Sequence, residues 1–244
     1  MDDQGSGGGD LYPHGRQVRK DERMKRILCL VCCLLLSLTC AAAAEETPRI
    51  AAANYALTFA VEQICGHDWS IETVNPEGKA DFMPDDAQLE ALRACDLVVV
   101  FGTEAWVSKL DEARVLKVGD ALTGVNPDAG EGFWLAPINM ALVGYTVSDA
   151  LAALDPDCAK EIANHNELFV QAMIDLDNTL RAHIVRNQTI RARGENGGDV
   201  SVFAAEYGLT NAPDDKKAIE LDPIANATEQ TYIDRMLENA EKLH

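Results

Sequence analysis

The run LVVVFG at Leu97–Gly102 is the segment that most constrains the fold. It is continuous, apolar and rich in β-branched residues, which is typical of a strand buried on both faces of a parallel sheet. Further short strands are expected at 49–54, 70–76 and 115–120, with helical patterns between them. Strands that alternate with helices imply right-handed crossovers. The sequence therefore predicts an α/β lobe in which helices cover both faces of a parallel sheet.

Helices are expected between these strands. Apolar residues recur at helical spacing in 55–65, 85–95 and 104–113, and Asp85 and Asp86 stand where the second of these helices needs a cap. Ligands of such sheets bind beyond the C-terminal ends of the strands. The expected binding region therefore consists of Asn54 and the loops 76–84, 101–106 and 121–132.

The second half of the chain has a different pattern. An amphipathic helix is predicted at 137–154, and a second helix runs from Pro156 to about Arg191, which is long enough to span the molecule. From Gly194 onward we expect one short helix, one strand at 216–223 and a closing helix. So small a piece cannot bury a two-faced core by itself. We therefore expect a reduced second lobe that packs on the first lobe and on the long helix.

The N-terminal region is typical of an exported protein. A charged pair, a short apolar run and an Ala-x-Ala site indicate a signal peptide at 24–44, after an upstream extension at 1–23. The apolar run is shorter than the ~20 residues of a membrane span. The residues before Cys40 fit a lipoprotein signal poorly. The mature chain is then divided into an N-terminal lobe (45–136), linking and spanning helices (137–193) and the reduced C-terminal lobe (194–244), and it is expected to be exported with no stable membrane span after signal cleavage.

Charge, cysteines and motifs exclude several functions. The chain carries 40 acidic residues against 21 Lys and Arg, a net charge of −19, which disfavours nucleic acid as a partner. The three cysteines after the signal peptide, Cys65, Cys95 and Cys158, are an odd number and are expected to be buried apolar side chains, although one pair could form. The sequence contains no Gly-x-Ser-x-Gly, His-Glu-x-x-His or phosphate-binding loop, so it is not expected to be an enzyme.

Six phrases, in order, carry a resemblance to a known family. They are CDLVVVFG (95–102), E-x-W-x-x-K-L (104–110), FWLAPIN (133–139), ALAALDP (150–156), FAAEYGL (203–209) and LDPI with the helix after it (221–243). Together they resemble the periplasmic substrate-binding proteins of bacterial ABC importers for zinc and manganese. The resemblance implies two α/β lobes joined by one long rigid helix, a metal ion in the cleft, and an ABC permease and ATPase as partners.

The metal ligands implied by the resemblance are missing. The loop PEGKADFMPD (76–85) keeps Asp81 but has no His, the second and third His positions are Gly132 and Gly197, and the strand of the fourth ligand, a carboxylate, is expected to be absent between Leu209 and Lys216. The histidines His67, His165, His183 and His244 lie away from the predicted strand ends. The acids left near the cleft are Asp81, Asp85, Asp86, Asp128 and Glu131. Each is more commonly a helix cap or a solvated charge.

Two of these acids are the candidate ligands of a residual site. Asp81 and Glu131 stand on the two loops that would face the cleft, and carboxylate oxygens alone suit Mn²⁺, Mg²⁺ or Ca²⁺ better than zinc. The neighbouring Phe133, Trp134 and Leu135 are expected to hold their loop by packing.

Two functions remain open. The first is a solute-binding component of an importer for zinc or manganese with a degenerate metal site. The second is an interaction protein of the same family that docks on the transporter or another periplasmic partner and carries no metal.

Overall fold

The computed structural model describes residues 47–66, 69–79, 81–123, 132–193 and 199–244. These residues belong to one compact unit, Thr47–His244. The predicted upstream extension and signal peptide, with Cys40, lie outside the described residues, as do His67, Asp128, Glu131 and Gly197.

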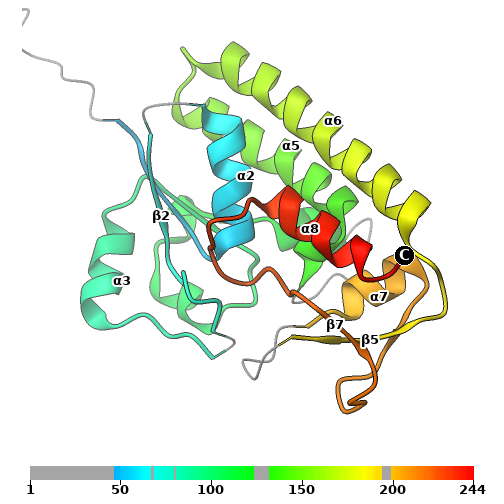
Figure 1. The fold of residues 1–244 in the computed structure, drawn as a ribbon. Coiled ribbons are helices and arrows are strands. Elements are labelled where there is room, and N and C mark those ends of the chain that lie inside the picture. The colour runs from blue at the N-terminus through cyan, green and yellow to red at the C-terminus, as the bar shows by residue number, and fades with distance from the viewer. Residues whose placement is uncertain (1–46, 67–68, 80, 124–131, 194–198) are drawn as a thin grey trace, which may run out of the picture. The chain divides into compact units, whose positions relative to one another are not determined.

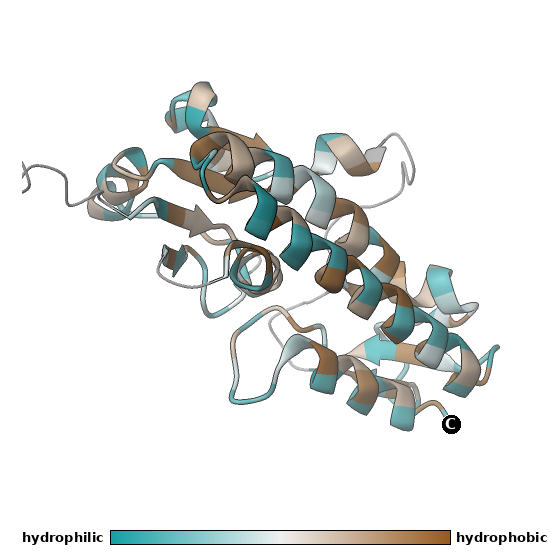
Figure 2. Ribbon diagram, turned by 90° about the horizontal axis from the view of Figure 1, so that it is seen from above, coloured by the Kyte–Doolittle hydropathy of each residue, from teal (hydrophilic) through white to brown (hydrophobic). Residues whose placement is uncertain are grey.

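The first lobe is built on a four-stranded parallel sheet, as predicted. Its strands are β1 (Arg49–Ala52), β2 (Ser70–Thr73), β3 (Leu97–Val100) and β4 (Val115–Lys117), in the order β2-β1-β3-β4. All four residues of β3 are buried, and the strands of this sheet are largely brown, that is hydrophobic, in Figure 2. The continuous apolar run of β3 therefore marks the centre of the sheet.

Two α-helices cover the two faces of this sheet. They are α2 (Tyr55–Cys65) and α3 (Asp86–Arg93). The chain steps outward from β1 to β2 and then back across β1 to β3, so right-handed crossovers place α2 and α3 on opposite faces (Figure 1). The predicted cap of α3 is confirmed, because the Asp85 carboxylate accepts a hydrogen bond from Gln88 N at 2.8 Å.

The predicted helix at 104–113 is wrong. Two 3₁₀ turns, η1 (Ala105–Lys109) and η2 (Glu112–Arg114), replace it. The carboxylate of Glu104 accepts from two backbone N–H groups, and that of Asp111 accepts from Ala113 N at 3.1 Å. Such local side-chain bonds compete with α-helical ones. Strand β4 is also shorter than predicted, and a short helix, α4 (Gly119–Thr123), begins where the strand was expected to continue.

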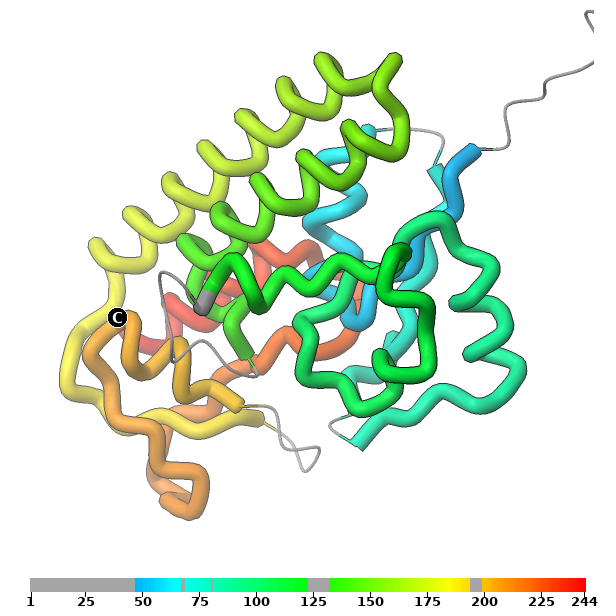
Figure 3. The backbone as a smooth tube through the Cα atoms, turned by 180° about the vertical axis from the view of Figure 1, so that it is seen from behind, coloured from blue at the N-terminus to red at the C-terminus, as the bar shows by residue number. Residues whose placement is uncertain are grey.

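Two long helices follow, α5 (Pro137–Leu154) and α6 (Ala159–His183), and they run side by side (Figures 1 and 3). They approach closely at Gly144, where a Cβ atom would stand 2.7 Å from Asn166 Oδ1. Among the described residues only α5 is long and apolar enough to cross a membrane. Half of it is buried inside the protein, as in the core helix of a folded domain.

The long helix ends earlier than predicted. It stops at His183 instead of Arg191, and 189–192 form a strand, β5 (Thr189–Ala192). Ile184 already has an extended backbone, with φ −73° and ψ 122°, and Asn187 adopts a positive φ of 65°, so neither residue continues a right-handed helix. At its other end the helix begins at Ala159, so Pro156 precedes its first turn instead of lying in it.

The second lobe has three strands where one was predicted. Strands β5, β6 (Thr210–Asn211) and β7 (Ile219–Leu221) form a parallel sheet in the order β6-β5-β7. The strand expected to be missing between Leu209 and Lys216 is therefore present as β6, although it has two residues and neither is a carboxylate. The helices are α7 (Ser201–Tyr207), which ends at the left-handed Gly208 as predicted, and α8 (Tyr232–Glu241).

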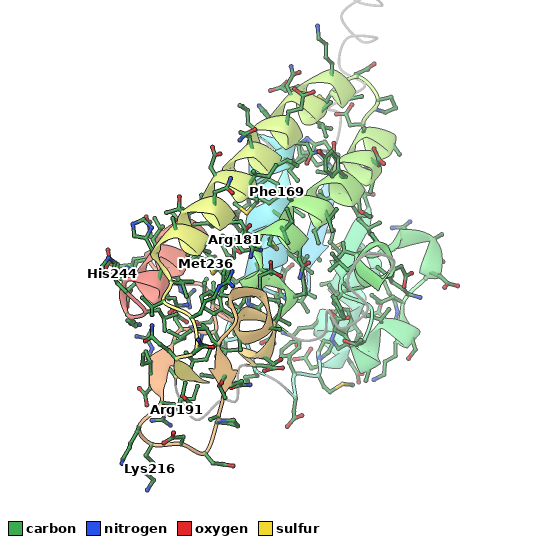
Figure 4. The ribbon with its side chains drawn as sticks, turned by 90° about the vertical axis from the view of Figure 1, so that its right-hand side faces the viewer. Phe169, Arg181, Arg191, Lys216, Met236 and His244 are labelled. Carbon is green, nitrogen blue, oxygen red and sulfur yellow. The ribbon has the colours of Figure 1, made fainter. Side chains whose placement is uncertain are left out.

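The second lobe is small and packs against the long helix α6. Helix α8 packs against α6, and Tyr207 of α7 donates a hydrogen bond to Asp177 of α6 at 2.9 Å. Arg181, one turn further along α6, pairs with Asp177 and with Glu206. Figure 4 shows Phe169 and Arg181 along α6, and Lys216 at the outer tip of the second lobe. The fold is thus α/β, with a four-stranded parallel-sheet lobe, two long helices of which α6 is the longer, and a smaller second lobe built on a three-stranded parallel sheet.

Candidate functional site

A cavity of about 470 Å³ lies at the C-terminal ends of β1, β2 and β3. The chain leaves β1 toward one edge of the sheet and leaves β3 toward the other, and ligands of open α/β sheets bind at such a reversal. The cavity is lined by aromatic side chains, amide side chains, a few charged groups and one residue of the second lobe. The main lining residues are Asn54, Asn75, Lys79, Asp81, Phe82, Met83, Phe101, Thr103, Glu104, Trp106, Phe133, Trp134 and Ala225. This confirms three of the four expected segments, while the fourth lies largely outside the described residues.

The loop after β2 forms one wall. Its shape is fixed by Asn75, whose side chain donates to Lys79 O at 2.8 Å and accepts from Lys79 N at 3.0 Å. Gly78 has a φ of +63°, and a Cβ atom there would stand 2.5 Å from the carbonyl oxygen of Ala225. The loop therefore touches the backbone of the second lobe, and only glycine fits at the contact.

Charged groups of this loop lie at the rim of the cavity. Asp81 is exposed, and the Lys79 ammonium lies 2.5 Å from the Glu77 carboxylate. Because this pair is exposed to solvent, it is expected to stabilise the loop only slightly.

The segment after β3 forms the next wall. Glu104 accepts hydrogen bonds from Phe101 N at 2.9 Å and from Gly102 N at 2.7 Å, so each of its carboxylate oxygens already binds a backbone group. The ring of Phe101 stacks on that of Phe133, with 4.9 Å between centroids. Trp106 is buried behind them. This wall is therefore mainly aromatic, and the Glu104 carboxylate stabilises the loop instead of facing a ligand.

The predicted packing of Phe133, Trp134 and Leu135 is confirmed. All three are buried in a 3₁₀ turn. Trp134 Nε1 donates to Pro223 O at 2.8 Å, and Tyr232 Oη donates to Trp134 O. These two bonds tie the first-lobe wall of the cavity to the second lobe.

Gly132, the second implied His position, lies directly before that turn. Its φ is +84°, and a Cβ atom would stand 2.6 Å from the carbonyl oxygen of Asp199. The space that a side chain would need is filled by backbone. A histidine at Gly132 would therefore have to displace the segment that begins the second lobe's short helix.

The segment between β7 and α8 completes the cavity. It runs from the second sheet toward the first lobe (Figures 1 and 3). Asp222 is buried and accepts from Arg235 Nε at 2.7 Å, from Arg235 Nη2 at 2.8 Å and from Ile224 N at 2.9 Å. Burial alone would raise the pKa of Asp222, but the bonds from Arg235 and Ile224 N and the charges of Arg235 and Arg193 lower it below its ordinary value.

The Asp222–Arg235 pair explains an unusual backbone. Ile224 has a φ of +52°, which is strained for a β-branched residue, and it is fully buried. Asp222 accepts a hydrogen bond from Ile224 N and so fixes the backbone there, and the next residue, Ala225, lines the cavity. The sequence contains both residues of the pair, but nothing in the spacing of 13 positions signals that they meet.

The described residues bring no set of transition-metal donors together. No group of three or more His, Cys, Asp or Glu side chains is placed to hold a metal ion within the described ranges. Asp81 lines the cavity, whereas Glu131 lies outside the described residues. His165 and His183 lie on α6, as predicted. A zinc site requires three or four such donors.

The cysteines do not supply donors either. Cys65, Cys95 and Cys158 are free; the first two are buried and the third is partly exposed, in line with small apolar side chains. Burial raises the pKa of Cys65 to about 11, so its thiol is protonated at neutral pH. None of the three cysteines belongs to a group of metal donors within the described residues.

Comparisons with solved structures agree in fold. The Zn(II)-bound ZnuA-like domain of Streptococcus pneumoniae AdcA has a TM-score of 0.67 and 17% identity, covering 81% of this chain and 98% of that one. The laminin-binding protein Lbp of Streptococcus pyogenes has a TM-score of 0.67 and 16% identity, covering 82% and 100%. The laminin-binding protein Lmb of Streptococcus agalactiae, described as an adhesin with metal-transporting activity, has a TM-score of 0.66 and 16% identity, covering 80% and 97%.

The family is shown by sequence. The comparison with curated proteins finds no match to this chain. Residues 50–213, more than half of the chain, match the model of the family described as zinc-uptake complex component A, periplasmic. This span contains the first lobe, both long helices and the first part of the second lobe. The chain therefore belongs to the family of the periplasmic component A of zinc-uptake complexes.

Proposed function

We propose that this protein is the periplasmic solute-binding component of an ABC importer for a divalent transition metal, zinc or manganese, and that its metal site is degenerate. The observation that carries the proposal is the cavity at the ends of β1, β2 and β3, between the first lobe and Ala225 of the second lobe, in a chain of the zinc-uptake family. An ABC permease and its ATPase are the partners. The protein binds and delivers, and it catalyses no reaction.

The degenerate site is proposed at Asp81 and Glu131. Asp81 lines the cavity and is exposed, so its carboxylate is accessible to an ion. Glu104 also lines the cavity, but each of its oxygens already accepts a backbone hydrogen bond. Two carboxylates are fewer ligands than zinc or manganese takes, so the affinity for a bare ion is expected to be low.

Export follows from the same proposal. Cleavage of the signal peptide at 24–44 would release a mature chain with a first lobe (45–136), linking and spanning helices (137–193) and a small C-terminal lobe (194–244), whose sheet also includes the preceding strand β5 (Thr189–Ala192). Anchoring through Cys40 is not part of the proposal.

The second candidate is an accessory protein of the family that binds no metal. The contact between Gly132 and Asp199 O favours it, because backbone fills the space of one implied ligand.

Calorimetry with the exported protein separates the two candidates. Zn²⁺ and Mn²⁺ are titrated into the wild type and into the Asp81→Asn and Glu131→Gln variants. Stoichiometric binding, on the order of micromolar, that either variant weakens supports the proposed function. The matched control is Asp149→Asn, which removes an exposed carboxylate on α5 and should leave binding unchanged. Absence of binding of the wild type to either metal, whether as the bare ion or as a small chelate, supports the accessory protein.

A further inference from the structure

We infer that the cavity receives its metal as a small organic chelate, neutral or positively charged, and not as a bare ion. The inference rests on the proposed function in one respect, that the cargo contains a divalent metal. Three features of the cavity carry it: its donor set, its size and the chemistry of its walls.

Among the residues that the structure describes, the set of metal donors at the cavity is too small for a bare ion. A bound zinc ion takes three or four protein ligands, and a magnesium-like ion keeps to oxygen ligands and several waters. Within the described part of the chain no three suitable side chains converge. A chelator carries its own donors, so the protein then has to recognise only the organic surface around the metal.

The cavity is large for an ion. Its volume of about 470 Å³ compares with roughly 30 Å³ for one water molecule in the liquid. It falls within the range of about 300–1,000 Å³ that is usual for pockets of small organic ligands. The space is therefore suited to a ligand of several rings or side chains.

The walls of the cavity are suited to a planar organic ligand. Phe82 and Phe101 are only half-buried, and Met83 at the same loop is 51% exposed. Aromatic faces stack on flat ligands and attract cations, and thioethers adapt to irregular shapes. Asn54, at the end of β1, accepts from Leu57 N at 3.0 Å through Oδ1, so its amide nitrogen is the group that would orient such a ligand, whereas the Asn75 amide is engaged with Lys79.

The charges select against an anionic chelate. The Lys79 ammonium already pairs with Glu77 at 2.5 Å, whereas Asp81 and Glu104 add two negative charges to the lining. The chain as a whole carries a net charge of −19. The field at the cavity therefore favours a neutral or cationic ligand over an anionic one.

The cavity is also pre-formed, as small-ligand sites usually are. The Gly78–Ala225 contact and the bond from Trp134 to Pro223 join its walls across the two lobes. Because the walls are already joined, the chain does not need an ion to bring the lobes together.

Calorimetry with defined probes tests the inference on the exported protein. The probes are Zn²⁺ alone, the cationic complex of Zn²⁺ with 1,10-phenanthroline, the neutral complex of Zn²⁺ with two histidines, the anionic Zn²⁺–EDTA complex, and phenanthroline without metal. We expect the cationic or the neutral complex to bind at least about tenfold more tightly than Zn²⁺ alone, Zn²⁺–EDTA or free phenanthroline.

Variants locate the binding. Phe82→Ala and Met83→Ala remove apolar surface from the rim and should each weaken chelate binding several-fold, and Phe101→Ala should weaken it by about tenfold. Phe101→Ala also removes the stacking on Phe133, so the two rim variants keep the test valid if that variant fails to fold. Leu168→Ala is the control, because Leu168 is 70% exposed on α6 and does not line the cavity.

The other outcomes separate the inference from the proposed function. If Zn²⁺ alone binds most tightly and phenanthroline removes it, the chelate inference is wrong and the proposed function stands. If free phenanthroline binds as tightly as its zinc complex, the cavity recognises the organic ligand whether or not it carries a metal, and the inference is wrong. If neither chelate binds, the inference is also wrong, and a failure of Zn²⁺ and Mn²⁺ as well would remove the proposed function.

Discussion

Asp222 and Arg235 form a bidentate ion pair inside the second lobe, with Nε–Oδ2 at 2.7 Å and Nη2–Oδ1 at 2.8 Å. Arg235 is 1% exposed and Asp222 is 6% exposed. The pair is completed by Asn239, which donates to Asp222 O and accepts from Asp222 N, both at 2.8 Å. Through Ile224 it fixes the backbone that reaches the cavity.

Replacing one partner of this pair should strongly destabilise the protein. Arg235→Leu leaves the Asp222 carboxylate buried without its counter-charge, and such a change costs about 3–5 kcal/mol. Urea unfolding followed by circular dichroism measures the loss. Lys242→Met is the control, because its pair with Glu238 is partly exposed and should contribute less than about 1 kcal/mol. Equal stability of the two variants would contradict a structural role for the Asp222 pair.

The same pair predicts a loss of stability in acid. The folded-state pKa of Asp222 is below its ordinary value of 3.8, so near and below that value the unfolded state binds more protons than the folded state. The contribution of the pair is full above the unfolded-state pKa and is lost as the pH falls through the folded-state pKa. Unfolding by urea between pH 7 and pH 3 should show this decline, and Asp222→Asn should flatten it. An unchanged slope in that variant would assign the acid sensitivity to other groups.

Gly132 and Gly208 offer a matched comparison. Both have positive φ, 84° and 67°, so alanine at either position costs about 1 kcal/mol or more through backbone strain. At Gly132 the new Cβ would also stand 2.6 Å from Asp199 O, whereas at Gly208 the nearest atom is Arg186 Cδ at 3.6 Å. We therefore expect Gly132→Ala to lower the unfolding free energy by roughly 2–3 kcal/mol and Gly208→Ala by about half as much. The reverse order would show that the 199 segment moves aside readily.

Gly144 should tolerate no larger side chain between α5 and α6. Alanine would gain about 1 kcal/mol of helix propensity, but its Cβ would stand 2.7 Å from Asn166 Oδ1 and 2.9 Å from the Phe169 ring. Overpacking of this kind costs about 1–3 kcal/mol, so we expect a net loss. The thermal unfolding of Gly144→Ala measures it. Adding Asn166→Ala should restore part of the stability, because it removes one of the two close contacts.

Local signals in the sequence account for much of the fold. The continuous apolar run of β3 identifies the centre of a parallel sheet, and Asp85 and Gly208 mark helix ends through their own side chain or backbone. The early end of α6 could not be seen in the same way. Apolar residues keep helical spacing as far as Ile184, and β5 exists only because Ile190 pairs with residues about 20 and 30 positions further along the chain.

The candidate site was predictable in place but not in composition. The topology of the sheet places a cavity beyond Asn54 and the loops after β2 and β3. Its closing contacts, Gly78 with Ala225 and Trp134 with Pro223, join residues far apart in sequence, and periodicity carries no information about them. The 3₁₀ turns after Glu104 were not predicted for a related reason. The sequence does not distinguish a carboxylate that accepts hydrogen bonds from its own loop from any other acidic residue in a helical pattern.

The bonds from Trp134 to Pro223 O and from Tyr232 to Trp134 O have a consequence for cargo exchange. A binding protein whose two lobes move apart exposes its ligand in one motion. Here that motion would have to break both hydrogen bonds and leave two buried polar groups without partners. On the proposed function, loading and unloading would therefore take place at the rim, beside the partly buried Phe82 and the exposed Met83. The proposed importer would then meet a cavity whose walls stay joined during cargo exchange.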